Sequence, residues 1–71
     1  MPYVNIKVTG GSDAPSAEQK AEWIRGVTEL LSSVLNKNPE TTVVVIDEIE
    51  TDNWGIGGKS VTVRRSEARN K

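Results

Sequence analysis

The chain has 71 residues, of which 9 are basic and 10 acidic, and it contains neither cysteine nor histidine. This composition excludes disulfides, the usual Cys/His zinc sites and any catalytic triad built on histidine. The balanced charge does not indicate a protein that binds nucleic acid. A single domain this short buries only about 60% of its unfolded surface, so self-association is the remaining route to stability and we expect an oligomer.

The possible general bases and the hydropathy of the chain further limit the kind of protein it can be. Any general base must be a carboxylate, a lysine, Tyr3 or the amino terminus. The longest strictly apolar run, Val43–Ile46, is too short to span a bilayer, and no basic region followed by an apolar stretch opens the chain. We therefore expect a soluble cytoplasmic protein that binds neither membranes nor nucleic acid.

The first predicted element is a strand over residues 2–9. Val4, Ile6 and Val8 alternate with polar side chains, which is the period of a strand with one buried face. Residues 10–15 then carry the glycines and the proline that are typical of a loop.

The segment from Ala17 to about Asn36 changes to the period of a helix. Ser16 is the predicted N-cap, with Gln19 completing a capping box, and Asp13 is the alternative N-cap. Gly26 costs about 1 kcal/mol relative to alanine inside a helix, which makes it a candidate for a close approach to another backbone. The apolar stripe consists of Ile24, Val27, Leu31 and Val34, widened by Trp23, Leu30 and Leu35.

A second strand is predicted over residues 41–49. Its β-branched run does not alternate, which is typical of a central strand covered on both faces. A strand, a helix and a strand make one right-handed β-α-β unit, so the two strands are predicted to be parallel. The fold class is therefore α/β, with a single β-α-β unit that forms one domain over residues 1–71.

The C-terminal part is predicted to hold a short hairpin or strand. Residues 54–58 read as a hairpin or tight turn rather than a phosphate-binding loop, because no helix is predicted after them. Residues 60–63 alternate and are compatible with a short strand, and residues 66–71 are expected to be a flexible tail. Trp54 and Ile56 suit the surface of a neighbouring subunit better than their own core.

Three groups of residues could carry chemistry. Pro2 follows the initiator methionine, which is normally removed before proline and would leave a secondary amine; alternatively, Pro2 is only a tolerated strand start. If Met1 is retained, the Pro2 nitrogen is an amide and cannot be a base. Arg64 and Arg65 could bind a carboxylate or lie exposed. The acidic residues between 47 and 52 could hold a hard cation, but a solvated loop is favoured.

Taken together, these stretches resemble the 4-oxalocrotonate tautomerase family. The matching stretches are Met1–Ile6, Ala17–Lys20, Pro39 with Val45–Ile49, and above all Asn53–Gly58, and they cover residues 2 to about 65. The resemblance implies a β-α-β subunit assembled into a homohexamer, arranged as a trimer of dimers. It implies that Pro2, freed of Met1, shuttles a proton between the enol and keto forms of a small 2-keto acid. No cofactor and no metal are implied.

The resemblance also assigns a binding site. Trp54 stands where the family has phenylalanine and would line the pocket with Ile56. The family's two anion-binding arginines are replaced here by Gly11 and Val43, so Arg64 and Arg65 are the preferred substitutes for binding the substrate carboxylate. Lys7 is a further candidate. Two alternatives remain open, a hydratase-like or dehalogenase-like relative and a non-catalytic assembly subunit of the same fold.

Overall fold

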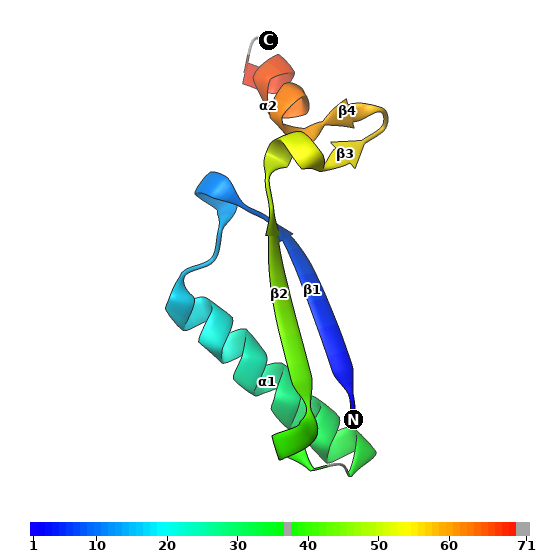
Figure 1. The fold of residues 1–71 in the computed structure, drawn as a ribbon. Helices are drawn as coiled ribbons and strands as arrows, with labels where there is room; N and C mark the ends of the chain where they lie inside the picture. Colours follow the sequence, from blue (N-terminus) through cyan, green and yellow to red (C-terminus); the bar gives the residue numbers. More distant parts are fainter. Residues whose placement is uncertain (37, 70–71) are drawn as a thin grey trace. The chain divides into compact units, whose positions relative to one another are not determined.

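The computed structural model describes residues 1–36 and 38–69, and its main elements follow the predicted order (Figure 1). Two strands flank a long helix in the chain, and a hairpin and a second helix follow. The helices and strands are, in chain order, β1 (Tyr3–Thr9), α1 (Ala17–Leu35), β2 (Val43–Ile49), β3 (Gly55–Ile56), β4 (Lys59–Ser60) and α2 (Val61–Arg69). Short 3-10 turns occupy Gly11–Asp13, Pro39–Thr41 and Thr51–Asn53.

The chain divides into two compact units, each of which is described by itself. The strand–helix unit comprises Met1–Lys7 and Pro15–Asp47, and therefore holds α1 and most of β1 and β2. The hairpin unit comprises Val8–Ala14 and the chain from Glu48 onward, and it holds β3, β4 and α2.

Strands β1 and β2 are parallel, as predicted, and they pair in a two-stranded sheet. The Val43 N–H donates to the Pro2 carbonyl at 2.9 Å where both strands begin. The Gly10 N–H donates to the Ile49 carbonyl at 2.7 Å where both strands end. From Tyr3 to Val8 the side chains of β1 alternate between exposed and half-buried, as expected of a one-sided strand, and only Thr9 at its end breaks the alternation.

Helix α1 begins with the predicted capping box. The Gln19 N–H donates to the Ser16 hydroxyl at 3.1 Å, and the Ser16 N–H donates to the Gln19 side-chain oxygen at 2.9 Å. Both bonds satisfy amides that the first turn leaves without helical partners. The helix ends at Leu35 because Asn36 adopts the left-handed conformation with φ 54°, a common way to stop a helix.

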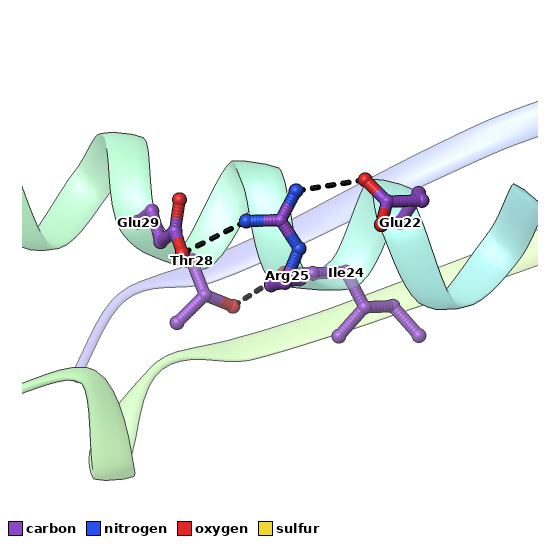
Figure 2. A network of polar contacts seen from close by, with 5 residues as sticks. All are labelled: Glu22, Ile24, Arg25, Thr28 and Glu29. Carbon is purple, nitrogen blue, oxygen red and sulfur yellow. Dashed lines mark hydrogen bonds and ion pairs between the residues drawn. The ribbon is translucent and has the colours of Figure 1, made fainter.

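On the polar face of α1, charged side chains pair with one another (Figure 2). Arg25 lies between Glu22 and Glu29, one turn away on either side, with N–O distances of 2.7 and 2.9 Å. The Thr28 hydroxyl donates to the Ile24 carbonyl at 2.6 Å. The hydrogen bond from Arg25 lowers the pKa of Glu22. This face is therefore a solvated surface. Within the segment Glu22–Glu29, its cation is already paired and is not free to bind a ligand.

The hairpin β3–β4 confirms the predicted turn. Gly55 pairs with Ser60 and Ile56 with Lys59 in an antiparallel ladder. The two residues between the strands, Gly57 and Gly58, have φ values of 62° and 89°. A two-residue hairpin turn needs positive φ at these positions, which glycine adopts without a steric penalty.

Helix α2 stands where the sequence predicted a short strand over residues 60–63 and a flexible tail over residues 66–71. The Ser60 hydroxyl accepts from the Val63 N–H at 3.2 Å and so caps the first turn of the helix that begins at Val61. The Lys59 amine donates to both carboxylate oxygens of Glu67 at 2.7 and 2.8 Å, which ties the last turn of α2 to the hairpin. Residues 66–69 are therefore helical, and residues 70–71 lie outside the described residues.

Almost no apolar side chain is enclosed within the chain. Among the described residues, Val61 is the one buried hydrophobic side chain, at 7% exposure. On α1, Leu30 and Val34 remain 61% and 70% exposed. The described strands β1 and β2 form a sheet of two, so the prediction of β2 as a central strand covered on both faces depends on neighbours outside this chain.

Candidate active site

Pro2 is held at the start of β1 through its backbone. It is half-buried, and its carbonyl accepts the N–H of Val43, the first residue of β2. Met1 before it is 91% exposed. Because the bond uses the carbonyl and not the nitrogen, removal of Met1 would leave the Pro2 amine free while β2 still anchors the residue.

Lys7 also belongs to the strand–helix unit, and there it is paired with Asp47. The Asp47 carboxylate accepts from the Asn5 amide at 2.9 Å and from the Lys7 amine at 3.0 Å. Both hydrogen bonds, that of Asn5 first, lower the pKa of Asp47. Lys7 is therefore paired with a carboxylate of its own chain, so its charge is already compensated.

The other four predicted site residues come together in the hairpin unit. They line one pocket of about 410 Å³, which is called the tryptophan pocket below. Trp54 and Ile56 enter it from the hairpin, and Arg64 and Arg65 enter it from α2. The described residues that line it are Thr9, Trp54, Ile56, Val61, Arg64, Arg65 and Ala68.

Short-range geometry explains why α2 contributes so many of these residues. Val61, Arg64, Arg65 and Ala68 are spaced by three, four and seven positions, so they share one face of the helix. The Val61 N–H donates to the Trp54 carbonyl at 2.8 Å, which joins the start of α2 to the residue before β3. This bond places the apolar wall and the arginine face around the same space.

Arg65 is engaged by a carboxylate. Its two terminal nitrogens donate to the two carboxylate oxygens of Asp13 at 3.1 and 2.6 Å, a bidentate pair. The Thr9 hydroxyl donates to the same carboxylate at 2.8 Å. The bond from Arg65 and then the bond from Thr9 lower the pKa of Asp13, and the partner carboxylate raises the pKa of Arg65.

Arg64 is in a different state. Among residues 1–36 and 38–69, it has no ion-pair or hydrogen-bond partner. Its Nη1 atom lies 3.6 Å from the position that a Cβ on Gly57 would take, so the guanidinium lies against the hairpin turn. Arg64 is the lining residue that can offer both a positive charge and free donors to a bound anion.

Sequence reasoning missed Asp13 and Thr9 as partners of the arginine face. Asp13 was considered only as a helix cap, and 52 positions separate it from Arg65. No local pattern signals a pair across that distance. The acidic residues between 47 and 52 form no metal site in the described part of the chain, where no group of three or more metal-ligating side chains is gathered. The described helices are also too short or too polar to cross a membrane.

Comparison with known proteins places the chain in a family. The model of the tautomerase enzyme family matches residues 2–64, nearly the whole chain. A probable tautomerase of Dickeya dadantii is 63% identical over 68 residues, which cover 96% of this chain and 98% of that protein. This chain belongs to the tautomerase family, as the sequence resemblance predicted.

Solved structures agree with the fold. The crystal structure of DmpI from Helicobacter pylori superposes with a TM-score of 0.80 at 45% identity, covering 92% of this chain and 97% of that one. The heterohexameric 4-oxalocrotonate tautomerase of Chloroflexus aurantiacus superposes with a TM-score of 0.76 at 26% identity, covering 87% and 95%. The β-α-β unit with parallel strands and a short C-terminal hairpin is thus the fold of the family, and oligomers occur within that family.

Proposed function

We propose that this chain is a cofactor-independent keto–enol tautomerase that acts on a small 2-keto acid, with the Pro2 amine as general base after removal of Met1. The observation that carries the proposal is the tryptophan pocket, in which an apolar wall faces an arginine without a partner among the described residues. The enol of a 2-keto acid has the matching features, a carboxylate for the cation and a planar carbon skeleton for Trp54 and Ile56. Family membership supports the reaction class.

The keto–enol proton transfer requires mainly a base of suitable pKa. An α-amino group ordinarily titrates near 8, and desolvation or a neighbouring cation lowers that value toward neutrality. The neutral Pro2 amine takes the proton from the enol hydroxyl, the C=O bond forms, and the electron pair of the C=C bond accepts the proton at carbon. An arginine on the carboxylate stabilises the negative charge that develops on the way.

We also propose that the working form is an oligomer built from copies of this chain. Support comes from the single buried hydrophobic side chain among the described residues and from the exposed apolar residues of α1, Leu30 and Val34 above all. A chain of this length does not enclose a core sufficient for stability by itself. The hexameric arrangement and the cytoplasmic location expected from the sequence stay predictions.

The test measures how fast the ultraviolet absorbance of phenylenolpyruvate, a monocarboxylate enol, decreases in the presence of the protein. The mass of the protein must show that Met1 is absent. We expect Pro2→Ala to lower the rate by roughly 10²- to 10⁴-fold, the usual contribution of a general base, while leaving the oligomer intact. A matched control inserts a lysine between Met1 and Pro2, which retains the methionine and converts the Pro2 nitrogen into an amide. This control should be as inactive as Pro2→Ala.

The outcomes separate the candidate functions. Full activity of Pro2→Ala would refute proline as the base. No rate above buffer in the wild type would favour the non-catalytic assembly subunit. The hydratase-like or dehalogenase-like alternative predicts instead that the wild type converts a halogenated acrylic acid while leaving the enol unchanged.

A further inference from the structure

The two arginines of the tryptophan pocket are neighbours in the sequence but differ in charge compensation. Both Asp13 oxygens are occupied by Arg65, at 3.1 and 2.6 Å, and the Thr9 hydroxyl adds a third bond to the carboxylate. Arg64 lacks such a partner among the described residues. Among the described residues, the lining therefore contains two guanidinium groups but only one uncompensated positive charge.

We propose that Asp13 is a specificity-determining residue: by neutralising Arg65 it leaves Arg64 as the single carboxylate-binding cation, so the pocket accepts a monocarboxylate with an apolar body and discriminates against a dicarboxylate. The proposal deepens the proposed function and rests on it for the identity of the ligand as a keto acid. Asp13 itself does not line the pocket, so it acts through Arg65.

The remaining lining fits one charged end and one apolar body. Trp54, Ile56, Val61 and Ala68 provide apolar surface, and Thr9 is the one uncharged polar side chain among the described lining residues. A second carboxylate of a ligand would meet an Arg65 whose positive charge Asp13 already compensates in a bidentate pair. The charge of that second carboxylate would also be repelled by the nearby Asp13 carboxylate, since like charges disfavour each other at short range.

The direct test is calorimetric titration with two unreactive acids, 3-phenylpropionate as the monocarboxylate and muconate as the dicarboxylate. We expect the wild type to prefer 3-phenylpropionate. Asp13→Asn keeps the side-chain volume but removes the charge, so it should shift the ratio of the two dissociation constants toward muconate by about tenfold, the scale of one hydrogen bond to a charged group. Arg64→Ala should weaken the binding of 3-phenylpropionate by about tenfold for the same reason, with Arg64→Lys recovering part of the loss.

Two further variants exclude indirect effects. In Asp13→Asn combined with Arg65→Ala, the gain toward muconate should disappear, because the released guanidinium is its source. Arg69→Ala removes another arginine of α2, one that does not line the tryptophan pocket, and should leave both dissociation constants unchanged. Urea midpoints of all variants, measured alongside, show that the preference and not the fold has changed.

The result that overturns the inference is an unchanged ratio in Asp13→Asn, an unchanged affinity in Arg64→Ala, or no binding of either acid by the wild type. The binding assay is independent of the base, so it separates this inference from the proposed function. Binding ratios that shift as expected in a protein without tautomerase activity would refute the proposed function alone. Activity toward phenylenolpyruvate with an unchanged ratio in Asp13→Asn would refute the specificity role alone.

Discussion

Gly26 provides a stability test because the single chain assigns it no steric role. It lies in the interior of α1, and a Cβ added there would meet no described atom within 4 Å outside the backbone of its own helix and its chain neighbours. In a helix interior, glycine is about 0.8–1.0 kcal/mol less favourable than alanine, because it loses more backbone entropy on folding. We therefore expect Gly26→Ala to raise the free energy of unfolding by about 1 kcal/mol per chain.

The assay is urea unfolding followed by helical circular dichroism at one fixed protein concentration, since the stability of an oligomer depends on concentration. With an m value of about 1 kcal/mol/M, which is at the low end for small proteins, the midpoint should rise by about 1 M with m unchanged. Ser33→Ala, at an exposed position of the same helix, is the control and should give about half that gain. A lower midpoint or an altered oligomer in Gly26→Ala would refute the reasoning and would place a neighbouring backbone at Gly26.

Three further predictions concern the cap, the turn and one ion pair. Ser16→Ala removes the acceptor of the Gln19 N–H and should lower the free energy of unfolding by about 1 kcal/mol, measured in the same assay. Gly57→Ala should cost roughly 1–2 kcal/mol, because its φ of 62° is unfavourable for a residue with a Cβ; a cost below that of Gly55→Ala would contradict this account. Hydrogen bonds from Asn5 and Lys7 lower the pKa of Asp47 in the folded chain. The stability that these bonds contribute is therefore fully present above about pH 4, the pKa of an unfolded aspartate, and is lost as the pH falls through the lower folded pKa. Urea midpoints between pH 6 and 2 should therefore fall less steeply in Asp47→Asn than in the wild type.

The elements predicted correctly are those whose signals are local. The capping box needs only Ser16 and Gln19, three positions apart, and the structure contains both of its hydrogen bonds. The turn needs only Gly57 and Gly58, whose positive φ values glycine adopts readily. Strand β1 shows its one-sided burial in the alternation of its own side chains. In each case the physical cause lies within one turn or one strand of the sequence.

Helix α2 was missed because its stability comes from neighbours. Alternation over residues 60–63 spans too few positions to distinguish a strand from the first turn of a helix. The helix is capped by the Ser60 hydroxyl and is joined to the hairpin by the pair between Lys59 and Glu67. The Ser60 cap is a local signal that the alternation concealed, whereas the bond from the Val61 N–H to the Trp54 carbonyl forms only across the closed hairpin.

The candidate site divides in the same way. Trp54, Ile56, Arg64 and Arg65, four of the described residues that line the tryptophan pocket, could be selected from the sequence through the resemblance to the family. Their charge states could not. The sequence treats the two arginines as equivalent, whereas a carboxylate 52 positions away, Asp13, compensates one of them.

This division predicts how substrate preference varies among proteins that share the pocket. A relative that keeps arginine at position 65 but has lost the acid at position 13 retains two uncompensated guanidinium groups, so it should bind muconate relative to 3-phenylpropionate about tenfold better than this chain does. A relative that has lost both should behave like this chain, because its pocket again holds one free cation. Titration of one relative of each kind with both acids checks the argument, and equal preferences in the two kinds would show that Asp13 organises the loop without setting the charge of the pocket.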